Sequence, residues 1–369
     1  MKIKENKRNY GRVLGSVVCI GGSCLLLLMT NQWEGFGEWY ATVIYPVFVG
    51  TIGRLFGVFP WSVAEIGLYL TAGALVASCL YVFIRILCKK AGRYSLLSWV
   101  ISWVTVCSVL LLLYTLLCGI NYQRRSFADY AKLKEEPYPV SQLEELCRSL
   151  TEEVNRLSGQ VERDEQGCMV LSGKEQEEAV EAMEALGREY PVLAGFYPRP
   201  KRLAIPWILS VQNLTGIYSP FTVEANYNSG IIDYNIPFTA CHELSHLRGF
   251  MEEEEANFIA YLACIHSDKK EFQYSGNLLA WIYAMNALYE GDRDIWKSVR
   301  TELNVEVEAD LEANRDYWKQ YEGPVAEVSN KMNDTYLKAN GQEDGVRSYD
   351  RMVDLLVAYQ KKANETDLK

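Results

Sequence analysis

Three long apolar runs in the first third of the chain constrain its fold more than any other feature. They cover residues 13–29, 66–87 and 96–120. A membrane-spanning helix needs about 20 largely apolar residues, within a range of about 17–25. Residues 29–33, after the first run, lack the small-residue cleavage site of a signal peptide. We therefore expect three transmembrane helices rather than a cleaved leader and buried core helices.

Charges around these runs predict how the chain crosses the membrane. Basic residues precede the first run and separate the second from the third, whereas residues 30–65 contain only Arg54. Cytoplasmic loops are enriched in Lys and Arg. We expect a multi-pass protein of the cytoplasmic membrane, with its amino terminus inside and everything after residue 120 outside. Arg124 and Arg125 argue against this orientation but are outnumbered.

A change in charge marks a domain boundary near residue 121. The first 121 residues contain 10 Lys and Arg against 4 Asp and Glu, whereas the remainder contains 27 against 43. We expect a membrane region over 1–121 and an extracytoplasmic domain over 122–369. The acidic balance argues against a nucleic-acid partner, since no basic stripe is present to neutralise phosphates.

The outer loop at 30–65 is aromatic throughout, and Trp and Tyr favour the membrane–water interface. We expect residues 39–58 to lie in the lipid bilayer interface, or to re-enter it, as a helix broken near Pro46 and Pro60. Anchoring is favoured over a substrate-binding role for this loop.

The central motif of the outer domain is His-Glu-x-x-His at residues 242–246. On a helix, His242 and His246 lie one turn apart on the same face, where both imidazoles can bind one metal ion. Glu243 stands beside them, in the position of a general base. The chain has three histidines and two of them belong to this motif. The pattern therefore favours a site for Zn²⁺ over a chance match on a solvated helix.

The third zinc ligand is expected from the glutamates at 252–255, because catalytic zinc usually has three protein ligands. Gly249 is suited to a left-handed helix end, after which a second helix can begin. Glu253 is favoured, with Asn257 one turn later hydrogen-bonding a ligand histidine. Glu252 is the alternative, since it occupies the third-ligand position of H-E-x-x-H-x-x-G-x-x-H enzymes.

The residues around this motif resemble a known family. Residues 237–246, 249–250, 253–258 and 261–264 are similar to the bacterial membrane-anchored, zinc-peptidase-like proteins of domain-of-unknown-function family 3810, and the likeness extends over most of the chain. The segment 253–257 also resembles the third-ligand segment of glutamate zincins. Amphipathic helices are also expected at 141–158 and 173–189. Together with these patterns, the resemblance predicts a mostly α protein: three transmembrane helices followed by a mainly helical, gluzincin-type domain with a small sheet.

Two further sets of residues complete the expected site. Zinc peptidases commonly bind substrate as a strand added to an edge strand. Residues 216–226 alternate apolar and polar types like an extended segment. Within them the candidate edge, equally readable as a surface loop, is the stretch 218–224, which includes Phe221, Thr222, Val223 and Glu224. A short strand is also expected at 204–209. Segments near the carboxyl terminus resemble the family, and a Tyr or Arg from them is expected to donate a hydrogen bond to the oxyanion. The candidates are Tyr336, Arg347 and Tyr349.

We interpret the chain as a membrane-anchored zinc metallopeptidase acting on a peptide or protein substrate outside the membrane. The alternatives are an inactive zinc-binding scaffold or sensor and a zinc amidase acting on cell-wall material. Glu243 favours an enzyme, because an inactive relative has no need of the base. An intramembrane protease is excluded, because Arg248 and the glutamates flank the motif where an apolar span would be required.

Overall fold

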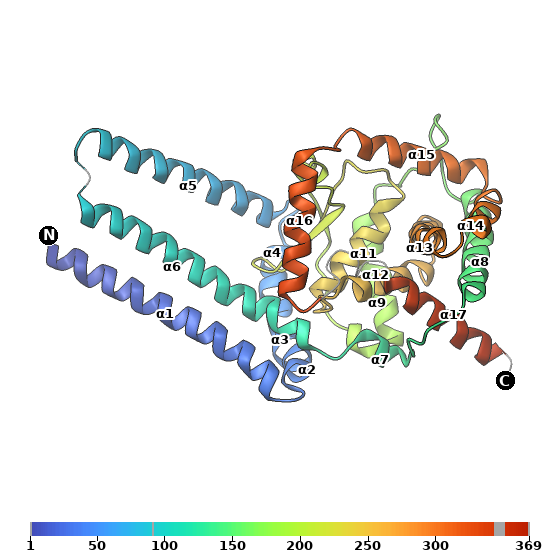
Figure 1. Cartoon of the computed structure of the whole chain (residues 1–369), viewed down its shortest axis with the longest axis horizontal. Helices are drawn as coiled ribbons and strands as arrows, with labels where there is room; N and C mark the ends of the chain where they lie inside the picture. The colour runs from blue at the N-terminus through green and yellow to red at the C-terminus, as the bar shows by residue number, and fades with distance from the viewer. Residues whose placement is uncertain (1, 91, 343–350, 368–369) are drawn as a thin grey trace.

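The computed structural model describes residues 2–90, 92–342 and 351–367. Three long helices project from one side of a mainly helical body, and the two ends of the chain lie at opposite ends of the molecule (Figure 1). The long helices are α1 (Lys2–Gln32), α5 (Val63–Leu87) and α6 (Arg93–Leu117).

The long helices contain three segments that are long and apolar enough to cross a membrane. These are Lys7–Gln32, Val63–Leu87 and Ser95–Gln123. The predicted runs at 13–29, 66–87 and 96–120 each lie inside one of them. Between α1 and α6, buried polar groups pair with one another, as the hydrocarbon region demands: Ser16 Oγ donates to Thr105 Oγ1 at 3.2 Å. The chain is therefore a membrane-anchored protein.

The outer loop is a nearly continuous helix from 36 to 57. Its parts are α2 (Phe36–Trp39), η1 (Tyr40–Ile44), α3 (Tyr45–Phe48), η2 (Val49–Gly53) and α4 (Arg54–Gly57), where η1 and η2 are π-helical turns. The expected break at Pro46 is wrong. Pro46 follows a π-helical turn at the start of α3, where the wider backbone accommodates a residue without an N–H.

This helix also packs against the body, which the sequence did not predict. Tyr45 and Val49 are buried, and the Tyr45 hydroxyl lies 2.7 Å from the Tyr218 hydroxyl and 3.2 Å from the Leu247 carbonyl. Trp39, Val43 and Val47 remain exposed. The loop thus joins the membrane region to the body through one face and leaves an apolar face uncovered.

Two buried carboxylates, one on the body and one on α5, each accept hydrogen bonds from the backbone of the other part. Glu224 accepts hydrogen bonds from the backbone N–H groups of Val63 at 3.2 Å and Ala64 at 2.7 Å, in the first turn of α5. Glu65, in the same turn, accepts from the backbone of residues 204 and 205 at 2.8 and 2.9 Å. The free N–H groups of a helix start favour such acceptors. The second span and the body are therefore held in one fixed relation.

The core of the body is formed by amphipathic helices packed around two buried ones. The third span is followed by two short helices, η3 (Gly119–Gln123) and α7 (Phe127–Ala131). Helix α8 (Val140–Ser158) then packs on α13 (Lys270–Gly291). Helix α9 (Glu175–Glu189) packs on α11 (Asn235–Leu247) and α12 (Glu253–Ile265). Nearly every residue of α11 and α12 is buried. α17 (Met352–Asp367) packs on α12 and α13, while α14 (Arg293–Arg300), α15 (Val305–Lys319) and α16 (Pro324–Ala339) follow the periphery.

A three-stranded sheet covers one side of α11. Its order is β1–β3–β2, with β1 (Lys201–Arg202) parallel to β3 (Glu224–Tyr227) and β2 (Gly216–Ser219) antiparallel to it. The strand expected at 204–209 is wrong, because Pro206 instead precedes the short helix α10 (Trp207–Ser210), a position where proline favours helix initiation. β2 is an edge strand.

Candidate metal centre

The two helices that carry the site are joined by a glycine turn. The N–H of Gly249 donates to the His246 carbonyl at 2.8 Å, and the N–H of Phe250 donates to the Ser245 carbonyl at 3.2 Å. This pair of bonds is a Schellman motif, and Gly249 has the left-handed φ of 88° that it requires. Glycine therefore reverses the chain within a few residues and brings α12 back alongside α11.

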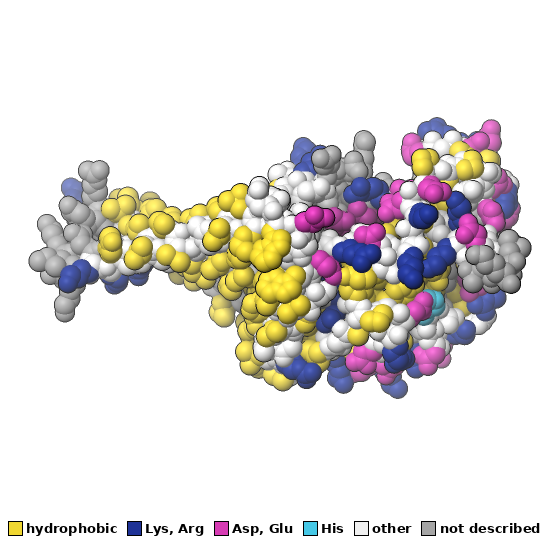
Figure 2. All heavy atoms as spheres, turned by 90° about the horizontal axis from the view of Figure 1, so that it is seen from below, with side chains coloured by type: hydrophobic (Ala, Val, Ile, Leu, Met, Phe, Trp, Pro, Cys, Tyr) yellow, Lys and Arg dark blue, Asp and Glu magenta, His cyan; other side chains and the backbone are white. Residues whose placement is uncertain are grey.

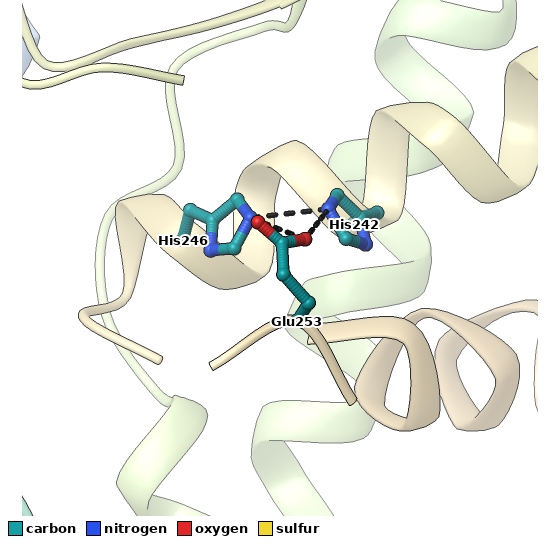
Figure 3. Close-up of side chains that lie close together, drawn as sticks. All are labelled: His242, His246 and Glu253. Atoms are coloured by element: carbon teal, nitrogen blue, oxygen red, sulfur yellow. Dashed lines mark hydrogen bonds and ion pairs between the residues drawn. The ribbon is translucent and has the colours of Figure 1, made fainter. Parts of the chain in front are cut away.

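This reversal brings His242, His246 and Glu253 together (Figure 3). The two imidazole Nε2 atoms lie 3.0 Å apart, and Glu253 Oε2 lies 3.3 Å from His242 Nε2 and 3.6 Å from His246 Nε2. One ligand atom from each residue falls within 4.8 Å of the others. Zinc ligands about 2.0–2.1 Å from a tetrahedral ion lie roughly 3.3 Å apart, so the three atoms have the spacing of a zinc site.

Hydrogen bonding around the cluster also fits a cation. His246 Nδ1 lies 2.8 Å from the Phe250 carbonyl oxygen, so Nδ1 keeps a proton, and Nε2 is the nitrogen that faces the cluster and would bind a metal ion. Glu253 Oε2 is buried and faces both imidazoles without a hydrogen bond from any described residue. Two imidazole nitrogens and a carboxylate are a donor set that zinc accepts.

The charges of the metal-free cluster are strongly coupled. Burial lowers the pKa of His246, but the carboxylates of Glu253 and Glu243 outweigh it and raise that pKa to about 9. Burial tends to raise the pKa of Glu253, but the two histidines hold it well below the usual range. Burial lowers the pKa of His242. Glu253 is therefore an anion at neutral pH, and an anionic carboxylate is suited to binding a metal cation.

Glu243 lies in the wall of the same cavity and is 4% exposed. Burial, together with the charge of Glu253, raises its pKa to about 8. Its Oε2 has no hydrogen-bond partner among the described residues. Gly216 of the edge strand packs against this carboxylate so closely that a Cβ there would stand 2.5 Å from Glu243 Oε1.

The other glutamates of the run have different roles. Glu252 is the N-cap residue of α12 and is not part of the cluster. Glu254 accepts hydrogen bonds from Arg351 at 2.6 Å and Gln342 at 2.8 Å. Glu255 accepts a hydrogen bond from the backbone of Phe127. The side chains of Glu254 and Glu255 therefore bind groups outside the cluster, and Glu252 begins the helix without a capping hydrogen bond from its side chain.

Asn257 lines the cavity one turn after Glu253. Burial lowers the pKa of His242, and a hydrogen bond with the Asn257 side chain opposes this shift, so Asn257 acts on His242 as predicted. His246 is oriented by the Phe250 carbonyl, a backbone atom that side-chain patterns cannot reveal.

Tyr336 of α16 lines the cavity, whereas Arg347 and Tyr349 lie outside the described residues. The Tyr336 hydroxyl oxygen lies 3.1 Å from the hydroxyl of Tyr114 and 3.3 Å from that of Tyr122. The single proton of Tyr114 also has a closer acceptor, Asn340 Oδ1 at 2.7 Å. Burial raises the pKa of Tyr336 far above its ordinary value, so the hydroxyl stays protonated.

Only the first residues of the expected substrate edge at 218–224 lie in the edge strand, since β2 ends at Ser219. Phe221, Thr222 and Val223 form a turn, and Glu224 belongs to the buried central strand. The exposed edge is β2, a few residues earlier, where Gly216, Ile217 and Tyr218 line the cavity. Alternation along 216–226 indicated extended chain but did not show which of its two halves lies at the edge.

The cavity has a volume of about 640 Å³ and draws its wall from distant parts of the chain. Besides the motif and β2, the wall includes Asn330 and Asn333 of α16, and Cys118 and Tyr122 at the outer end of the third span. No local pattern marks these four residues. Such a concave, partly apolar site with a few converging polar groups is typical of small-molecule or peptide binding.

Comparison of the chain with models of protein families gives a match. The model of the family described as "Protein of unknown function (DUF3810)" matches residues 40–357, and the chain therefore belongs to this family. The expectation drawn from the residues around the motif is confirmed at the level of the family. No curated protein and no solved structure matches the chain.

Proposed function

We propose that the protein is a zinc-dependent metallopeptidase of gluzincin type, anchored in the cytoplasmic membrane and hydrolysing peptide bonds outside it. The observation that carries the proposal is the convergence of His242, His246 and Glu253 in one cavity with Glu243, whose Oε2 has no hydrogen-bond partner among the described residues. A structural zinc site requires the ligands but not the additional carboxylate.

In this proposal His242 Nε2, His246 Nε2 and Glu253 hold Zn²⁺. Bound zinc supplies a Lewis acid that polarises a carbonyl and lowers the pKa of water. Glu243 takes the proton from the attacking water and passes it to the leaving amine. The Tyr336 hydroxyl donates to the developing oxyanion.

The edge strand β2 suits an extended peptide. Its unpaired backbone groups can bind the substrate main chain as a further strand, which positions a carbonyl without requiring a particular side chain. Gly216 keeps this strand in contact with Glu243. An extended peptide is therefore favoured over a branched or globular ligand.

Placement outside the cytoplasm rests on the distribution of Lys and Arg around the three spans. A reporter that is active only outside the cytoplasm, fused after Lys369, is expected to be active. Activity of a cytoplasm-only reporter at this position would reverse the orientation.

The remaining candidates are a zinc-binding scaffold or sensor, and an amidase acting on cell-wall material. The scaffold leaves the Glu243 carboxylate without a role. An amidase would use the same catalytic groups as a peptidase. It differs in the bond that it hydrolyses, which is an amide bond of cell-wall material.

The decisive experiment uses the full chain purified in detergent. Elemental analysis is expected to find one zinc per chain, and digestion of a random peptide library is expected to yield new termini. Glu243→Gln preserves the side-chain volume and all three ligands, so zinc content and melting temperature should be unchanged while the rate falls about 10²–10⁴-fold. Equal activity of the zinc-loaded wild type and Glu243→Gln would refute the proposal, and cleavage of cell-wall fragments alone would favour the amidase.

A further inference from the structure

The wall of the catalytic cavity contains the outer end of a membrane span. The third span extends over Ser95–Gln123, and both Cys118 and Tyr122 line the cavity with His242 and His246. About 20 residues cross the hydrocarbon core, so the core ends near residue 115 when counted from Ser95. Helix α6 ends at Leu117, and Cys118 and Tyr122 follow it directly, before and in the short helix η3. Both residues therefore lie just beyond the hydrocarbon core, next to the lipid headgroup layer.

Contacts at Tyr336 hold the cavity against this span. Its hydroxyl lies within hydrogen-bond distance of the hydroxyls of Tyr114 and Tyr122, and Cys118 Sγ lies 3.7 Å from Tyr336 and from Met251 Sδ. Tyr336 and Met251 also line the cavity. The span is thus part of the site and not only a tether to it.

The second span is bound to the sheet that forms another part of the cavity wall. Glu224 of β3 binds the first turn of α5, and β3 pairs with the edge strand β2 over residues 216–219. Lys201 of β1 pairs with Glu224 and donates to the Phe56 carbonyl at 2.8 Å. The sheet therefore cannot move away from the second span without breaking the hydrogen bonds of Glu224 to α5 and of Lys201 to Phe56.

The helix at 36–57 gives the body an apolar surface on the membrane side. Trp39, Val43 and Val47 are 48, 52 and 59% exposed, and Trp33 and Trp61 at its two ends are 60 and 52% exposed. Figure 2 shows hydrophobic side chains continuing from the spans onto the adjoining end of the body. Indole side chains favour the membrane–water interface, and continuity with the spans identifies lipid as what covers this surface.

From these contacts we infer that the substrates are membrane-anchored polypeptides, cut within about ten residues of the point where they leave the bilayer. The inference rests on the proposed hydrolase function and names its substrate class. A chain rising from the membrane enters the cavity past Cys118 and Tyr122. The apolar wall formed by Leu214, Ile217 and Leu279 suits the rings of Trp and Tyr, which are enriched where a transmembrane segment leaves the bilayer. Anchoring in the same bilayer also raises the effective concentration of substrate at the site.

The test uses the full-length, zinc-loaded protein in liposomes. A cleavable ten-residue segment is selected by display of a random library next to a synthetic transmembrane helix. The same segment is then presented in four forms: 5, 20 or 40 residues from that helix, and as a free peptide. We expect the 5-residue form to be cut at least about tenfold faster than the 40-residue form, with the free peptide slowest. The new termini should map close to the bilayer.

The outcomes separate the inference from the function on which it rests. Cleavage of the free or 40-residue form as fast as the 5-residue form overturns the membrane-proximal substrate class and leaves the hydrolase intact. Absence of cleavage in every form, with Glu243→Gln identical to wild type, overturns both. The variant Glu243→Gln, assayed on all four forms, also shows that any cleavage comes from this site.

Discussion

Gly216 and Glu243 are in such close contact that no side chain fits between them. A Cβ on Gly216 would stand 2.5 Å from Glu243 Oε1, 2.7 Å from Thr239 Cγ2 and 2.9 Å from the Asn226 carbonyl oxygen. The edge strand β2 is thus in direct contact with the proposed general base, Glu243. A peptide bound to this edge would place its backbone beside the same carboxylate.

The first prediction follows from this contact. Gly216→Ala should force Glu243 or the β2 strand aside, because Cβ atoms do not approach other heavy atoms within 3.0 Å. We expect zinc content to be unchanged and peptide hydrolysis to fall at least about tenfold, since a displacement of about 1 Å at a reacting group can cost about 10²-fold.

Gly50→Ala is the matched control, since nothing lies within 4 Å of a Cβ at Gly50 in the outer loop. Its hydrolysis rate should equal that of the wild type. Full activity of Gly216→Ala would show that neither Glu243 nor β2 takes part in the reaction as proposed.

The second prediction concerns the third ligand. Glu253→Ala removes the carboxylate that faces both histidines and should abolish stoichiometric zinc binding, measured by elemental analysis after dialysis. Glu252→Ala changes only the N-cap of α12, where the side chain makes no capping hydrogen bond, and zinc content should stay at one per chain. The reverse pattern would move the ligand to Glu252 and contradict the geometry of the cluster.

A third prediction tests Tyr336. Tyr336→Phe removes the hydroxyl proposed to stabilise the oxyanion and should lower kcat about 10²–10³-fold, with little change in KM or zinc content. Tyr289→Phe, at an exposed position on α13, is the control and should leave kcat unchanged. A normal kcat for Tyr336→Phe would limit its role to holding α16 against the third span through Tyr114 and Tyr122.

The fourth prediction concerns stability and not catalysis. Lys201 and Glu224 form an ion pair whose side chains are 3% and 1% exposed. Glu224→Gln leaves Lys201 as an unpaired buried charge, which typically costs about 3–5 kcal/mol. We expect the melting temperature of the detergent-solubilised protein to fall by at least about 5 °C.

The exposed pair of Arg199 and Glu177 provides the comparison, with side chains 66% and 41% exposed. Glu177→Gln should cost less than about 1 kcal/mol and barely change the melting temperature. Equal effects of Glu224→Gln and Glu177→Gln would mean that the link between the sheet and the second span contributes little to stability.

Helices whose hydrophobic residues recur at a regular spacing along the chain could be predicted from the sequence. The three apolar runs lie inside helices long enough to span a membrane, and the amphipathic helix expected at 141–158 is α8, because hydrophobic residues recur with the helical period. Gly249 turns the chain as expected, because only a residue without a Cβ readily adopts its φ of 88°.

Errors arose where packing overrides a local preference. Pro46 is tolerated within the outer helix because π-helical turns flank its segment. Phe221, Thr222 and Val223 have residue types typical of strands, yet Val223 adopts a left-handed φ of 52° in the turn between β2 and β3. Pairing with β3 selects the preceding residues as the edge, and such long-range pairing leaves no mark in a short stretch of sequence.

The sequence by itself determined the membrane helices and the pair His242 and His246, because residues four apart on one helix must share a face. It also limited the third ligand to a few neighbouring glutamates. Only the tertiary structure decided that Glu253 joins the histidines while Glu254 pairs with Arg351, and that Gly216, Cys118 and Tyr122 enclose the same cavity. These contacts join residues far apart in the chain, and they depend on how whole helices and strands pack, which no local spacing of residue types encodes.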